Sequence, residues 1–185
     1  MRMQRPIRVA SGLALLASCG SGPTGVTSQP GSLTAPPDPT GTRAVSGAPL
    51  FVLVGSTSVT TPDVRDRLAR LRALPWAVSV QIARLAAEPD TLLTIGRAVA
   101  FDVAPGQRLV FAGDALARNA TGSTSWRGVL QGGKLGDVHV VYGDSGVTAT
   151  LRVLPPNGAV YTVQPLGSGL HAITQVDESR VPPPG

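Results

Sequence analysis

Residues 138–163 read VHVVYGDSGVTATLRVLPPNGAVYTV, and this stretch decides the fold class. Three runs rich in Val, Thr and Tyr are separated by two turn sequences, GDSG at 143–146 and PPNG at 155–158. β-Branched and aromatic residues favour strands, and an Asn-Gly pair favours the tight turn of a hairpin because both central residues need positive φ. The stretch therefore predicts three successive antiparallel strands.

Similar segments extend over most of the chain from residue 50 onward. Val78, Val80 and Ile82, for example, alternate with smaller or polar residues, which is the period of a strand with one buried face. The expected strands are residues 50–54, 78–83, 91–95, 99–103, 108–111, 125–130, 138–142, 147–153, 159–163 and 171–176. Their regular spacing and the Gly- and Pro-rich turns between them predict a mainly β single domain, built as an antiparallel, sandwich-like sheet.

One segment near the start of this domain has helical periodicity instead. Residues 61–75 read TPDVRDRLARLRALP, which opens with a capping Thr followed by a Pro suited to the first helical position. Val64, Leu68 and Leu71 are then spaced by four and three residues, and the pattern ends at a Leu-Pro pair. We expect one amphipathic helix of about three turns.

The net charge of +5 arises largely in the first eight residues, which contain Arg2, Arg5 and Arg8. Without residues 1–18 the chain keeps 13 basic and 11 acidic residues. The remaining arginines cluster once, on the expected helix at positions 65, 67, 70 and 72, among acidic rather than aromatic side chains. Nucleic-acid surfaces combine basic and stacking residues, so we interpret these arginines as a solvated helix face and expect no nucleic-acid partner.

The amino terminus has the features of a bacterial lipoprotein signal. A basic segment, MRMQRPIR, precedes an apolar run that is shorter than the roughly 20 residues needed to span a bilayer. Leu16-Ala17-Ser18-Cys19 then resembles a lipobox, and Cys19 is the chain's only cysteine. We therefore expect a signal peptide at residues 1–18, lipid such as palmitate on Cys19, and membrane attachment in the bacterial cell envelope. Gly20 after the cysteine implies the outer membrane in a Gram-negative cell.

Composition divides the rest of the chain into three parts. Residues 19–48 hold the lipidated cysteine and a stretch rich in Gly, Pro, Ser and Thr, which predicts a flexible tether because it lacks the apolar side chains of a core. Residues 49–178 are the expected β-rich domain, and residues 179–185 are a Pro-rich tail.

Residue usage argues against a self-contained active site. With two His and one Cys, the chain cannot build a metal site from three or four such ligands. Ser145 lies in a GDSG turn similar to the nucleophile loop of chymotrypsin-type proteases, but His139 lies only four residues earlier, on the strand leading into that turn. His139 and His171 with Asp137 or Asp177 would make a weak metal site. We predict a non-enzymatic protein with no catalytic residue, cofactor or metal.

Three large aromatic residues, Trp126, Tyr142 and Tyr161, lie within expected strands. We interpret them as core or edge anchors of the sheet.

Short motifs follow one another in a fixed order between residues 76 and 178. They are a Trp-x-Gly strand, a Tyr-x-Val-x-Pro-Leu strand and a Gly-x-His-x-Ile strand, ahead of a Pro-rich segment. The residues at these positions are Trp126, Gly128, Tyr161, Pro165, Leu166 and His171. This order resembles the amino-terminal propeptides of secreted bacterial zinc metallopeptidases of the reprolysin-like, adamalysin-related type.

The resemblance implies a domain that assists the folding of a metallopeptidase or keeps it latent. In that family a cysteine thiolate sometimes binds the zinc, but Cys19 is assigned here to lipid, and the sequence stops where a catalytic domain would begin. We therefore expect binding in trans to a separately encoded metallopeptidase, through strand edges and the β surface around Trp126 to Tyr142. Two alternatives stay open: a structural or ligand-binding envelope lipoprotein, and a truncated gene product.

Overall fold

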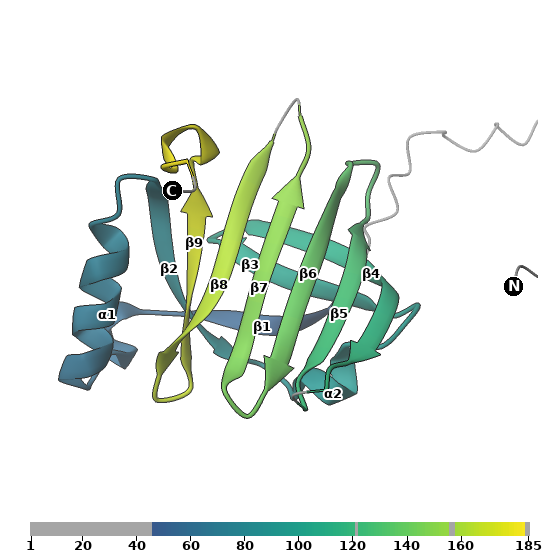
Figure 1. Cartoon of the computed structure of the whole chain (residues 1–185), viewed down its shortest axis with the longest axis horizontal. Coiled ribbons are helices and arrows are strands. Elements are labelled where there is room, and N and C mark those ends of the chain that lie inside the picture. The colour runs from purple at the N-terminus through teal and green to yellow at the C-terminus, as the bar shows by residue number, and fades with distance from the viewer. Residues whose placement is uncertain (1–45, 121, 156–157, 184–185) are drawn as a thin grey trace, which may run out of the picture. The chain divides into compact units, whose positions relative to one another are not determined.

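The computed structural model describes residues 46–120, 122–155 and 158–183, which form nine strands, two α-helices and two 3₁₀ turns (Figure 1). The strands are β1 (Ala48–Val54), β2 (Ala77–Leu85), β3 (Ala98–Ala104), β4 (Gln107–Arg118), β5 (Thr124–Leu130), β6 (Gly136–Gly143), β7 (Gly146–Val153), β8 (Ala159–Gly167) and β9 (Leu170–Val176). The helical elements are η1 (Ser56–Ser58), α1 (Pro62–Arg72), α2 (Pro89–Leu92) and η2 (Glu178–Arg180). The predicted mainly β class is confirmed.

The strands close into a barrel in the order β1-β2-β9-β8-β7-β6-β5-β4-β3. Neighbouring strands are antiparallel except β1 and β3, which run parallel. Phe51 of β1 illustrates the closure, since it pairs with Leu85 of β2 on one side and with Phe101 of β3 on the other. The arrangement is therefore a barrel rather than the expected sandwich-like sheet, because β1 occupies the gap where β2 and β3 would otherwise have free edges.

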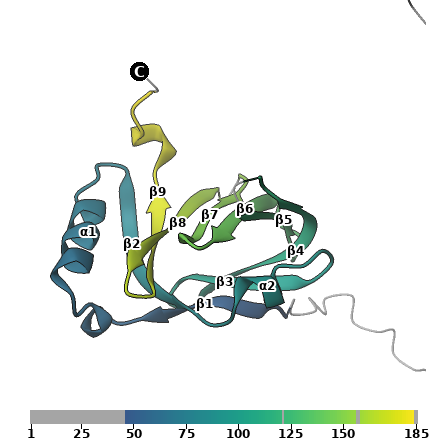
Figure 2. The ribbon, with the colours of Figure 1, turned by 60° about the horizontal axis from the view of Figure 1, so that its bottom comes forward.

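Alternating side chains fill the interior of the barrel. The inward-facing residues of β7 are all buried: Val147, Ala149, Leu151 and Val153. The rings of Phe51, Phe101 and Phe111 meet in the same core, with centroids 6.2 Å apart for the first two and 5.6 Å apart for the last two. Figure 2 shows β4–β8 arching opposite β1 and β3, so that this core lies between the two sides.

Residues 91–95 do not form the expected strand. Pro89–Leu92 is instead a single helical turn, with Pro at its start and Asp90 in its first turn. Leu92 and Leu93 follow one another into the main core and are 5% and 0% exposed. Two adjacent buried leucines produce the short apolar run that suggested a strand, because periodicity alone does not separate a short buried helix from a strand.

The helix predicted at residues 61–75 is present as α1, which packs on the outside of the barrel (Figures 1 and 2). Val64 and Leu68 face inward and are 2% and 4% exposed. They form a second, smaller core with four strand residues: Ile82, Leu166, Leu170 and Ala172. The helix therefore covers part of β2, β8 and β9 and leaves its arginine-bearing face to solvent.

Trp126 and two glycines share a crowded region of the barrel interior. The Trp126 side chain is fully buried, and its Nε1 donates a hydrogen bond of 3.2 Å to the Thr94 carbonyl oxygen, just after α2. A Cβ on Gly113 would contact that same oxygen and lie 2.6 Å from Trp126 Nε1, and a Cβ on Gly128 would lie 2.7 Å from Trp126 Cη2. The indole therefore needs glycine at both positions to pack against β4 and β5.

We expect Gly113→Ala to lower the free energy of unfolding by about 1–3 kcal/mol, because the added methyl group overpacks the indole and the Thr94 carbonyl. Urea denaturation of the purified chain measures this change. Gly55→Ala is the matched control: its Cβ would meet only Thr57 Oγ1 at an ordinary 3.6 Å, and we expect a change within about 0.5 kcal/mol. Equal effects of the two substitutions would contradict the packing argument.

Candidate functional site

The GDSG turn does not assemble a nucleophile and a base. Ser145 lies exposed in the turn between β6 and β7. His139 faces outward on β6 and pairs across the sheet with Thr150 of β7. Within the part of the chain that the structure describes, no hydrogen bond joins Ser145 to His139.

The two histidines lie on opposite sides of the barrel wall. His139 is exposed on the outer face, whereas His171 of β9 is 4% exposed and contacts the core residue Phe51. The structure therefore does not bring them together. Among residues 46–120, 122–155 and 158–183, no group of three or more His, Cys, Asp or Glu residues could hold a metal ion.

His171 is held in an apolar environment. Its ring meets the Phe51 ring edge-on, with centroids 5.1 Å apart, and neither ring nitrogen hydrogen-bonds to any described residue. Burial lowers the pKa of His171 below its ordinary value of 6.5, because a charged imidazole would lose its hydration there. The geometry explains a neutral core residue and supplies no proton-transfer partner.

The other motif residues of the 76–178 stretch also have structural roles. Trp126, Tyr161 and Leu166 are buried. The Tyr161 hydroxyl accepts a hydrogen bond of 2.9 Å from Gln107 Nε2, and Tyr142 is 7% exposed in the same core. The interpretation of the three aromatic residues as core anchors is therefore confirmed.

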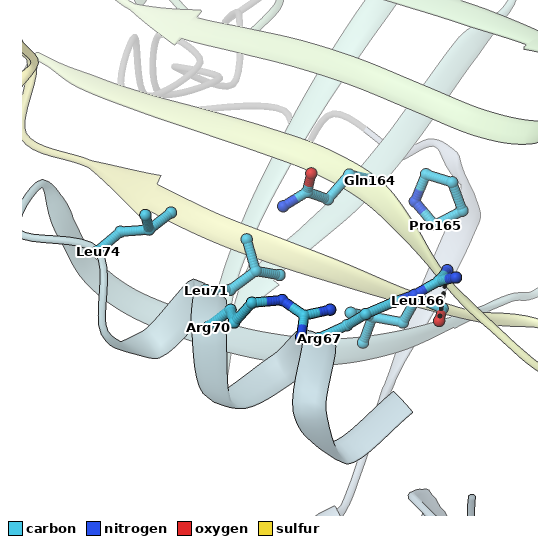
Figure 3. A pocket seen from close by; sticks show the side chains of 7 residues that line it. All are labelled: Arg67, Arg70, Leu71, Leu74, Gln164, Pro165 and Leu166. Carbon is cyan, nitrogen blue, oxygen red and sulfur yellow. Dashed lines mark hydrogen bonds between the residues drawn. The ribbon is translucent and has the colours of Figure 1, made fainter. Parts of the chain in front are cut away.

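A groove lies between α1 and β8, with a volume of about 210 Å³ (Figure 3). Its lining is divided between the two elements: Arg67, Arg70, Leu71 and Leu74 come from α1 and the turn after it, and Gln164, Pro165 and Leu166 come from β8. Arg67 Nη1 crosses the groove and donates a hydrogen bond of 3.3 Å to the Leu166 carbonyl oxygen. The site thus combines cationic, amide and apolar groups.

The interpretation of the arginines as a uniform solvated helix face did not predict this groove. Arg67 and Arg70 are exposed, as expected for such a face, but they are also one turn apart and next to the half-buried Leu71 and Leu74. The only local sequence signal of the groove is this i, i+3 spacing of two arginines beside leucines. The strand that forms the other wall is almost a hundred residues further along the chain, with Arg67 and Leu166 separated by 99 positions.

Two other hollows have neutralised or mixed linings. One of about 520 Å³ lies beside the β3–β4 turn, where Arg108 and Asp102 form a two-bond ion pair of 2.6 and 2.9 Å. Another of about 450 Å³ lies between the end of β9 and the β7–β8 turn, beside Asp177 and Glu178. The α1–β8 groove differs from both because its two cations have no carboxylate partner among the described residues.

The signal peptide, Cys19 and the tether up to residue 45 lie outside the described residues, so their assignments stay predictions. In the described part of the chain, no helix has the length and apolar character required to cross a bilayer.

We expect the barrel to lose stability as the pH falls below about 6.5, and His171→Leu to weaken that loss. The pKa of His171 is lower in the folded chain, so over this range the unfolded chain binds more protons and its population rises with acidity. Urea denaturation at several pH values between 7 and 5 measures the slope. His139→Gln is the control, since His139 is exposed on the outer face of the barrel; equal slopes in H171L and the parent chain would contradict this prediction.

Comparison of the chain with protein families, with curated proteins and with solved structures finds no match.

Proposed function

We propose that this chain is a non-catalytic lipoprotein of the bacterial cell envelope whose β-barrel binds a partner protein, with a zinc metallopeptidase acting in trans as the partner. The order of the motifs from Trp126 to His171 is the observation that carries the partner assignment. The partner's folding or latency is what the barrel would control. The chain's few His and Cys residues support a binding role over catalysis.

The lipobox supports attachment at the membrane surface. Cys19 would carry the lipid, and residues 20–48 would hold the barrel at a typical distance of about 30 Å from it, from the dimensions of a flexible Gly-rich coil. A partner in the same envelope compartment would then meet the barrel at a raised local concentration. In a Gram-negative cell, Gly20 after the cysteine favours the outer membrane.

Closure of the barrel changes the expected mode of binding. Each of the nine strands is hydrogen-bonded to a neighbour on both sides over at least part of its length, so no described strand offers a whole free edge for strand addition. Trp126 points into the core, so the outer face near it presents Arg127, His139 and Val141 instead. The partner would be recognised through outward-facing side chains.

A role as a ligand-binding envelope lipoprotein is the second candidate; the side-chain chemistry of the α1–β8 groove supports it, although the groove's small volume of about 210 Å³ favours a protein segment. The groove places two guanidinium groups beside leucines, which suits an anionic ligand with an apolar part.

The test of the proposed function is co-purification from the envelope of the encoding organism. Tagged, lipidated full chain is solubilised, captured and washed, and the retained proteins are identified by mass spectrometry. We expect enrichment of a zinc metallopeptidase over an unrelated lipoprotein carrying the same tag, and altered peptidase activity when purified chain is added. Absence of any enriched metallopeptidase would overturn the assignment of the partner.

We expect Cys19→Ser to abolish incorporation of labelled palmitate and to release the chain from the membrane fraction, because serine lacks the thiolate that accepts the lipid. Ser18→Ala is the matched control and should stay lipidated, since it keeps a small residue before the cysteine. Fractionation with lipid labelling measures both. Retention of C19S in the membrane at the level of the parent chain would show that the lipobox is not the anchor.

A further inference from the structure

The arginines of the α1–β8 groove do not use the carboxylates nearest to them. Asp63 and Asp66 precede Arg67 and Arg70 by four residues, which is the favourable order for ion pairs along a helix. Neither pair is formed. Arg67 instead reaches across to the Leu166 carbonyl oxygen.

Two like charges consequently lie together at one groove. Arg67 and Arg70 extend from α1 toward β8 (Figure 3), and as neighbours at i and i+3 they repel one another. Gln164 faces them from β8, and its side-chain amide has no hydrogen-bond partner among the described residues. The groove lining contains no carboxylate, so an incoming carboxylate could accept hydrogen bonds from both guanidinium groups and from the Gln164 amide nitrogen.

The remaining walls are apolar. Leu71 and Leu74 are half-buried on the helix side, and the buried Leu166 lies opposite them on the strand side. An apolar side chain inserted between them would remove these surfaces from water while its backbone stayed outside. The groove therefore offers one apolar subsite beside one anion subsite.

The size of the groove decides between a small molecule and a protein segment. Its volume of about 210 Å³ is below the ~300–1,000 Å³ of typical small-molecule pockets, and it is an open groove between a helix and a strand. It cannot enclose most of the surface of a free ligand. One or two side chains of a larger partner fit such a space.

We propose that this groove docks an acidic-apolar segment of a partner protein, with one or two carboxylates on Arg67, Arg70 and Gln164 and an adjacent apolar side chain against Leu71 and Leu74. This inference rests on the proposed function, because it supplies the docking surface for that partner. The charge complementarity identifies the segment by its chemistry: Asp or Glu next to a large apolar residue.

The direct test is an NMR titration of the purified full chain with the peptide acetyl-Glu-Leu-Phe-Glu-amide. We expect amide shifts confined to residues 67–74 and 164–166, and affinity at least about tenfold weaker in R67E/R70E, since each loses a charge-assisted bond and gains a repulsion. The affinity of R67Q/R70Q for the peptide should lie between those of the parent chain and R67E/R70E. Leu74→Ser should weaken binding through the apolar subsite alone.

The matched control is R65E/R72E, which makes the same charge change on the same exposed helix but outside the groove. We expect its affinity for the peptide to stay within about twofold of the parent chain, and the peptide acetyl-Lys-Leu-Phe-Lys-amide to cause no shifts. If R67E/R70E and R65E/R72E lose the same affinity for the acidic peptide, the effect comes from the net charge of the helix, and the proposed site is overturned. Absence of binding of the acidic peptide at millimolar concentration would also overturn the site. So would binding of the chain to phosphatidylglycerol vesicles that R67E/R70E abolishes, because the arginines would then bind lipid headgroups.

Co-purification separates failure of this inference from failure of the proposed function. If the parent chain captures a metallopeptidase and R67E/R70E captures it equally well, the partner is right and the groove is wrong. If the parent chain captures none while the peptide still binds at the groove, the docking site stands and the metallopeptidase assignment falls. Loss of capture in R67E/R70E but not in R65E/R72E is the result we expect.

Discussion

The pairing of β1 with both β2 and β3 is the constraint on which the barrel depends. β1 is antiparallel to β2 and parallel to β3, and it comes from residues 48–54, before the helix and every other strand. Without it, β2 and β3 would each present a row of unpaired backbone groups. Residues 76–178 supply the other eight strands, but they need this earlier segment to complete the sheet.

Closure also limits which surfaces could recognise a partner. The interior is occupied by aromatic and aliphatic side chains, with Trp126 packed against Gly113 and Gly128 and with Leu93 at the end of α2. A filled barrel of this kind acts as a rigid support and leaves binding to its outer surface. The one long helix on that surface, among the residues described, is α1, and its junction with β8 carries the unpaired cations.

Local patterns explain why most of the secondary structure could be predicted from the sequence. The alternation around Val78 to Ile82 and the Gly-rich turns are properties of neighbouring residues, and so is the helical spacing of Val64, Leu68 and Leu71. The error at residues 91–95 arose because a short apolar run fits a strand and a buried helical turn equally well. Barrel closure and the α1–β8 groove were not predictable, because each joins segments that are distant in the sequence and share no local signal.

The charge distribution indicates what the groove contributes to binding. Beyond residue 18 the chain carries 13 basic and 11 acidic residues, so its long-range field is weak. The attraction of Arg67 and Arg70 for an anion therefore acts over about a Debye length, roughly 8 Å at physiological salt. Electrostatic steering of a partner from a distance needs a larger net field than this chain has. Contact between desolvated charged groups acts only after two proteins have met, and it then selects between partners. In the proposed function, a membrane tether of short reach would supply the encounter that the weak field does not, and the groove would then provide selectivity.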